Sequence, residues 1–123
     1  MMGADLGHMA VPQLVELFTR HALEQFQAEL YGDTAKYNRL YRRIIAIEQE
    51  LKDREGDKRT ALAALFSHRN PQVRLMAAES TLFVAPEAAR QTLQEIWDRK
   101  EFPQAAYAMG TLRALERGDR KPT

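Results

Sequence analysis

The chain contains no cysteine. Without thiols it can form no disulfide framework, thiol nucleophile, iron–sulfur cluster or cysteine-ligated zinc site, and its composition gives no sign of an oxidising compartment. The N-terminus has no basic segment followed by an apolar one. No stretch approaches the roughly 20 apolar residues that a membrane-spanning helix needs. These absences favour a cytoplasmic protein without membrane association.

Charge of a dominant sign is also missing, since 18 Lys and Arg face 17 Asp and Glu. This balance excludes the domain-wide basic field of a dedicated nucleic-acid binder, although it leaves room for a local basic patch. The sequence has no Gly-rich phosphate loop, no Gly-x-Ser-x-Gly elbow and no His-Glu-x-x-His motif. His8, His21 and His68 are dispersed, so no metal site is predicted. We therefore expect no enzymatic activity and no cofactor.

Helical periodicity runs through most of the chain, because apolar residues recur every three or four positions. No alternating strand pattern of four or more residues is present, and the β-rich stretch Thr81 to Val84 lies inside a helical period. Prolines, glycines and capping residues set the helix boundaries. The six predicted helices run from Pro12 to Gly32, Asp33 to Leu51, Lys58 to Ser67, Asn70 to Phe83, Pro86 to Trp97 and Pro103 to Gly118.

The length of 123 residues is enough for one domain with a real core. We expect a single helical-repeat domain over residues 11–118, preceded by a loose lead-in at residues 1–10 and followed by a frayed tail at residues 119–123.

Two of the predicted helices begin at equivalent prolines, Pro71 and Pro103, which are 32 positions apart (103 − 71). The same shift aligns Gln72 with Gln104 and Phe83 with Leu115. A repeat of about this length is typical of solenoids, in which helix pairs bury their apolar faces against neighbouring pairs. The sequence therefore predicts an all-α fold of about six helices in stacked antiparallel pairs. The alternative is six amphipathic helices in a bundle.

Two family resemblances follow from particular residues. Ala61-Leu62-x-x-Leu65, Asn70-Pro71-x-Val73-Arg74 and Ala77-Ala78 resemble a HEAT-type repeat, which implies a HEAT-like α-α superhelix; the second unit departs from it, since Ala106 replaces the arginine. From about Leu14 to Leu115 the chain also resembles a bacterial family of domains of unknown function, numbered twenty-nineteen. That likeness rests on Gly32-Asp33-Thr34-x-Lys36-Tyr37-Asn38-Arg39-Leu40, Asn70-Pro71-Gln72-Val73-Arg74-Leu75 and Pro103-Gln104-Ala105. The family implies a helical-repeat fold and supplies no catalytic residues.

A basic cluster of Lys36, Arg39, Arg42 and Arg43 falls on the second predicted helix, opposite its apolar stripe. In one interpretation these cations contact nucleic-acid phosphates while a tyrosine stacks on a base. In the other they form an ordinary solvated face, because acidic residues follow them directly.

Arg74 stands one turn into the fourth predicted helix, and two roles are open to it. It pairs with an acidic group or carbonyl of the neighbouring repeat, or it faces a binding groove together with Gln72, Gln104 and Tyr107. Trp97 and Phe102 are candidate partner anchors, because aromatics dominate interface energetics, but Trp97 shares the apolar stripe of its helix and is predicted to lie in the core.

The remaining histidines have structural interpretations. His21 is predicted to be partly buried between helices. His68 is predicted to cap the last carbonyl groups of the third helix.

The sequence thus predicts a non-catalytic protein-interaction module with a regulatory or neutralising role, for which self-association is also plausible. The alternative is a nucleic-acid-binding helical repeat that uses the basic face of the second helix. The predicted partner-binding residues are Lys36, Arg39, Arg42, Arg43, Gln72, Arg74, Gln104 and Tyr107.

Overall fold

The computed structural model describes residues 5–123, and this range contains helices and turns but no β-strand. The predicted all-α class is confirmed. The five α-helices are α1 (Val11–Leu30), α2 (Thr34–Asp53), α3 (Pro71–Ser80), α4 (Pro86–Asp98) and α5 (Gln104–Arg117), and two 3₁₀ segments are η1 (Leu6–His8) and η2 (Lys58–Ser67). The chain divides into two compact units, residues 1–61 and 62–123. Residues 1–4 of the predicted lead-in lie outside the described range.

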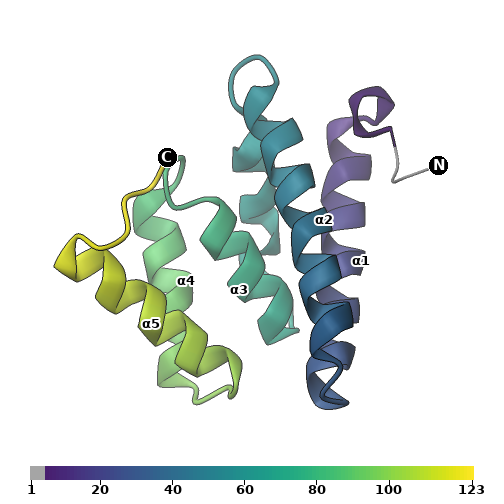
Figure 1. The fold of residues 1–123 in the computed structure, drawn as a ribbon. Coiled ribbons are helices and arrows are strands. Elements are labelled where there is room, and N and C mark those ends of the chain that lie inside the picture. The colour runs from purple at the N-terminus through teal and green to yellow at the C-terminus, as the bar shows by residue number, and fades with distance from the viewer. Residues whose placement is uncertain (1–4) are drawn as a thin grey trace. The chain divides into compact units, whose positions relative to one another are not determined.

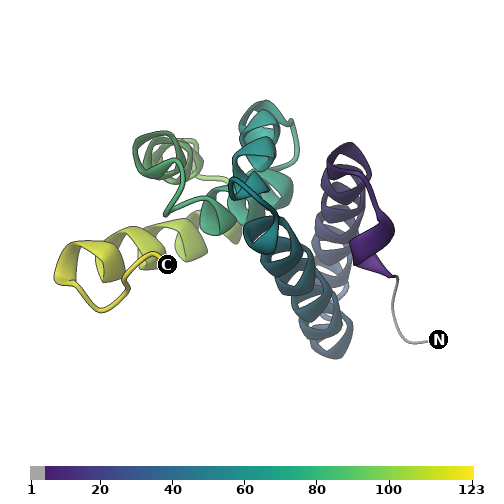
Figure 2. The ribbon, with the colours of Figure 1, turned by 90° about the horizontal axis from the view of Figure 1, so that it is seen from above.

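Unit 1 is an antiparallel pair of α1 and α2, which lie side by side in both views (Figures 1 and 2). Asp33 caps α2 by accepting a 3.0 Å hydrogen bond from the Lys36 backbone N–H, as its sequence position predicts. The Arg54 guanidinium donates to the Leu6 carbonyl at 3.0 Å and so fixes η1 against α2. Buried side chains recur every three or four residues along both helices, namely Leu14, Phe18, Ala22, Gln25, Ala28, Leu40, Ile44, Ile47 and Leu51.

The segment predicted as the third helix has the expected bounds, 58 to 67, but it is a 3₁₀ helix rather than an α-helix. Its buried residues, Arg59, Leu62 and Leu65, are spaced three apart. In a 3₁₀ helix side chains three positions apart lie above one another, so this winding directs all three inward.

Unit 2 contains α3, α4 and α5. Asn70 caps α3 by accepting hydrogen bonds from the Gln72 and Val73 N–H groups at 2.8 and 3.3 Å. The core consists of apolar side chains from all three helices and from the α3–α4 connection, namely Leu75, Ala78, Leu82, Ala89, Leu93, Ile96, Ala105, Ala108 and Leu115, with Trp97 packed against them.

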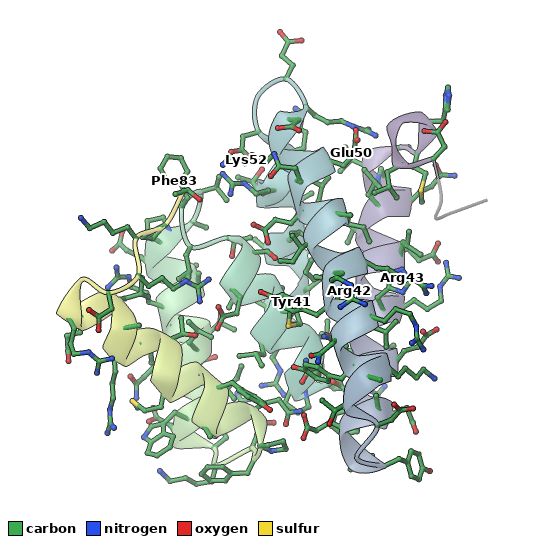
Figure 3. The ribbon with its side chains drawn as sticks, in the orientation of Figure 1. Tyr41, Arg42, Arg43, Glu50, Lys52 and Phe83 are labelled. Atoms are coloured by element: carbon green, nitrogen blue, oxygen red, sulfur yellow. The ribbon has the colours of Figure 1, made fainter. Side chains whose placement is uncertain are left out.

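The prediction that α3 extends to Phe83 is wrong, because the helix ends at Ser80. The Thr81 hydroxyl donates back to the Ala77 carbonyl at 2.8 Å, and Pro86 disfavours helical backbone at the residue before it. Phe83 therefore lies on the α3–α4 connection, where it projects outward and is 57% exposed (Figure 3).

The 32-residue repeat of the sequence is visible as direct contact between equivalent positions. The Gln104 side-chain amide donates to the Gln72 carbonyl oxygen at 2.9 Å, and the Thr111 hydroxyl donates to the Glu79 carboxylate. Each pair spans 32 positions of the chain. α3 and α5 therefore lie side by side and run in the same direction (Figure 1).

Part of the predicted frayed tail is anchored on unit 2. The Arg120 guanidinium forms an ion pair with the Glu79 carboxylate. The Arg120 backbone N–H donates to the Ala114 carbonyl at 3.1 Å.

Candidate functional site

The α4–α5 turn, residues 99–103, is a surface feature of unit 2 whose backbone is held by hydrogen bonds to α4. The Lys100 N–H donates to the Trp97 carbonyl at 3.0 Å, and the Glu101 N–H donates to the Ile96 carbonyl at 3.3 Å. This pair of hydrogen bonds is a Schellman motif, which requires a left-handed residue and usually takes glycine there. Here the residue is Lys100, with φ 55°. The chain therefore holds a lysine in a conformation that side chains disfavour.

An ion pair between the buried Arg74 and the partly exposed Glu101 fixes this turn to α3. Two guanidinium nitrogens of Arg74 donate to the two carboxylate oxygens of Glu101 at 2.7 and 2.8 Å. The same guanidinium donates to the carbonyl groups of His68 and Arg69 at 2.6 and 3.0 Å. Hydrogen bonding from Arg74 lowers the pKa of Glu101, and partial burial opposes that shift. Glu101 is therefore a carboxylate whose position is set on both oxygens.

The turn presents an aromatic cluster, which we define as Trp97, Lys100 and Phe102. The Trp97 and Phe102 rings meet edge to face, with centroids 6.0 Å apart and an interplanar angle of 77°. The Lys100 ammonium lies 4.0 Å from the centroid of the Trp97 ring. Phe102 is 57% exposed, whereas Trp97 is half-buried. The exposed phenyl ring of Phe102 thus packs against the half-buried Trp97 ring.

A polar hollow of about 440 Å³ lies beside the turn, lined by residues 66–69, Arg74, Glu95, Arg99 and Glu101. The Arg74–Glu101 pair belongs to its wall. His68 does not cap η2 as predicted; instead its Nδ1 accepts a 3.0 Å hydrogen bond from the Asn70 N–H. In the neutral imidazole this places the ring proton on Nε2. The hollow therefore carries guanidinium, imidazole and carboxylate groups.

The predicted groove residues of unit 2 occupy two different environments. Gln72 and Gln104 are buried and hydrogen-bonded to each other, and Arg74 is 4% exposed and paired with Glu101. Two roles were predicted for Arg74, and its geometry is that of the first, pairing with an acidic group, here Glu101. Tyr107 is 46% exposed. Only Tyr107 of these four side chains is accessible at the surface.

The basic cluster lies on α2 in unit 1. Arg39, Arg42 and Arg43 are exposed and Lys36 is half-buried, and within residues 5–123 none of the four forms an ion pair. At 100° per residue the four positions cover about 120° of the helix surface. They occupy one flank of α2 rather than the side directly opposite its apolar stripe. Figure 3 shows Arg43 on one side of α2 and Tyr41 on the other.

The basic flank borders a half-buried histidine on α1. Burial lowers the pKa of His21, the Glu24 carboxylate raises it, and the nearby Arg43 lowers it. His21 is thus half-buried against α2, as the sequence predicts.

Sequence reasoning did not identify Arg99, Lys100 or Glu101 as site residues. The available signal was the charged run from Asp98 to Glu101 directly before Phe102 and Pro103, in a segment with no glycine to form the turn. No group of three metal-binding side chains occurs in the part of the chain that the structure describes. No helix formed by residues 5–123 is both long and apolar enough to cross a membrane.

Residues 5–123 form helices that pack in pairs and contain no strand, so this is an all-α protein. Residues 12–116 match the family model described as "Domain of unknown function (DUF2019)", and the chain belongs to this family. It is also similar to the crystal structure of the protein RPA1889 from Rhodopseudomonas palustris CGA009. The two share 45% sequence identity, the alignment covers 98% of this chain and 100% of that one, and the TM-score is 0.95. A comparison with curated proteins gives no match.

Proposed function

We propose that this protein is a non-catalytic interaction module that binds another protein through the aromatic cluster of the α4–α5 turn. The single observation that carries the proposal is an exposed phenyl ring, Phe102, on a turn fixed by the Arg74–Glu101 pair. Interfaces concentrate their binding energy in a few aromatic and arginine side chains. A preorganised anchor also loses little conformational freedom on binding.

Unit 2 offers a matched control for this proposal. Phe83 and Phe102 are equally exposed, at 57%, and Phe102 stacks on the Trp97 ring next to the ion-paired Glu101, on a different turn from Phe83. If surface hydrophobicity alone attracted partners, the two rings would be equivalent. The proposal instead assigns binding to Phe102.

The test is affinity capture from an extract of the native cell, followed by calorimetry with the purified partner. Phe102→Ala should weaken binding by about 2 kcal/mol, roughly 30-fold, whereas Phe83→Ala should leave it near the wild-type value. Circular dichroism must show that both variants are folded. Equal binding by both variants, or a selective loss in Phe83→Ala, would contradict the proposal.

The alternative function is nucleic-acid binding by Lys36, Arg39, Arg42 and Arg43. It is favoured by three exposed arginines on one flank of α2 that have no ion-pair partner among the described residues. Phosphate contacts of this kind release counterions and weaken steeply with salt. If nuclease digestion of the extract abolishes capture, the alternative replaces the protein-binding proposal.

We also propose that unit 2 follows a HEAT-like repeat. Support comes from the two hydrogen bonds that join positions 32 residues apart, since stacked repeats place equivalent residues side by side.

A further inference from the structure

The polar hollow beside the α4–α5 turn contains two cations without an ion-pair partner. Arg74 and Glu101 form a bidentate pair and neutralise each other. Arg69 and Arg99 also line the hollow, and neither forms an ion pair within the described range. Glu95 is the remaining acid. Counting arginines and glutamates alone, three arginines against two glutamates leave a formal charge of +1 on the lining.

The donors that remain suit a planar monoanion. A guanidinium presents parallel N–H groups that match the two oxygens of a carboxylate. His68 adds a ring N–H on Nε2, because its Nδ1 is occupied by the Asn70 N–H. A single carboxylate balances a charge of +1, whereas a phosphate dianion would add excess negative charge next to Glu95 and Glu101.

The hollow and the aromatic cluster are adjacent in the chain. Arg99 and Glu101 line the hollow, while Lys100 and Phe102, from the same turn, belong to the aromatic cluster. A partner segment that packs an apolar residue on Phe102 can therefore place a neighbouring side chain in the hollow.

We propose that the hollow binds the carboxylate of an Asp or Glu side chain from an acidic segment of the partner protein. This inference rests on the proposed function, because it names the chemistry of the same partner. Arg69 and Arg99 are the binding residues. Arg74 and Glu101 are positioning residues that shape the wall.

The test uses the full chain and acetyl-glutamate amide, a blocked residue with one carboxylate. Titration followed by NMR of the arginine Nε–H signals should saturate with a dissociation constant on the order of 1 mM. Acetyl-glutamine amide should cause no saturable change. Arg69→Gln combined with Arg99→Gln should raise the dissociation constant at least about tenfold. The loss of one charge-assisted hydrogen bond already weakens binding by about that factor.

The matched control is Arg90→Gln combined with Arg113→Gln. These exposed arginines lie on α4 and α5 outside the hollow, so binding should be unchanged. Equal weakening in both double variants, absence of saturation, or tighter binding of inorganic phosphate than of the blocked glutamate would overturn the inference.

The two proposals fail separately because Phe102 is not part of the lining. Phe102-dependent capture without carboxylate binding would overturn only the carboxylate site. Saturable carboxylate binding without any captured protein would overturn the proposed function and, with it, the assignment of the carboxylate to a partner protein, and would leave the carboxylate site itself.

Discussion

The two units each contain a helix-to-helix turn of the same hydrogen-bonded type. In unit 1 the Gly32 N–H donates to Glu29 and the Asp33 N–H donates to Ala28; in unit 2 Lys100 and Glu101 make the equivalent bonds to Trp97 and Ile96. Both turns need one left-handed residue. Unit 1 uses Gly32 at φ 68°, whereas unit 2 uses Lys100 at φ 55°.

The difference between the turns lies in what fixes them. At Gly32 an added Cβ would meet no atom within 4 Å, so backbone freedom alone accounts for the glycine. At Lys100 the surroundings hold the backbone: the ammonium lies over Trp97, and the next residue, Glu101, pairs with Arg74. Strained non-glycine residues persist where the surrounding structure over-determines them, and they cluster at functional sites. Asp57, at φ 47° and paired with Arg59, is a second left-handed residue of this kind, so the backbone of Lys100 supports the binding role proposed for the α4–α5 turn only together with the exposed ring of Phe102.

The largest expected effect comes from removing the ion pair that distinguishes the two turns. Glu101→Ala leaves the guanidinium of Arg74 buried without its carboxylate, which should lower the free energy of unfolding by about 3 kcal/mol. Denaturation followed by fluorescence of Trp97, the single tryptophan, reports unit 2 directly.

The control for this change is Glu50→Ala in unit 1. Glu50 also accepts from an arginine, Arg54, at the C-terminal end of α2. The two carboxylates are similarly exposed, at 28% and 24%, but the Arg54 side chain is 23% exposed whereas that of Arg74 is 5% exposed. Loss of such a pair should cost under about 1 kcal/mol. Similar losses of unfolding free energy in both variants would show that the Arg74–Glu101 pair stabilises the α4–α5 turn no more than an ordinary surface pair does.

An intermediate effect is expected from pH. Arg74 holds the pKa of Glu101 below its ordinary value of 4.5, so the stabilisation is fully present above that value and is lost as pH falls through the lowered pKa. The difference in unfolding free energy between wild type and Glu101→Gln should therefore be constant near about pH 7 and shrink toward about pH 3. A difference that grows on acidification would contradict the assignment.

The starts of α2 and α3 were predictable from local chemistry. Asp33 and Asn70 cap helices because their oxygens reach backbone amides a few residues ahead, and such contacts need no tertiary information. The contact between Gln72 and Gln104 was indicated by the 32-residue shift. Phe83 was misplaced because a β-branched stretch that also fits a helical period does not reveal where the helix stops.

The α4–α5 turn itself was not predictable. The pairing of Arg74 with Glu101 spans 27 positions and depends on the packing of three helices. A left-handed lysine has no local signal, since glycine or asparagine is the residue that marks this conformation. Sequence reasoning therefore found Arg74 but not its partner.

The smallest effects come from exchanging the left-handed residues themselves. Gly32→Ala should lower the free energy of unfolding by about 1 kcal/mol, because alanine disfavours φ 68° although the space around it is open. Lys100→Gly should change it by less than about 0.5 kcal/mol. Relief of left-handed strain is offset by the lost cation–π contact with Trp97 and by the greater freedom of glycine in the unfolded chain.

Far-UV circular dichroism follows the Gly32 variant, and Trp97 fluorescence follows the Lys100 variant. A stabilising effect of Lys100→Gly would also be informative. If Lys100→Gly stabilises unit 2 by more than about 1 kcal/mol, the contact between the ammonium and Trp97 contributes little to folding. Lysine would then be retained at this position at a net cost in stability, which strengthens the case that its charge serves binding rather than the fold.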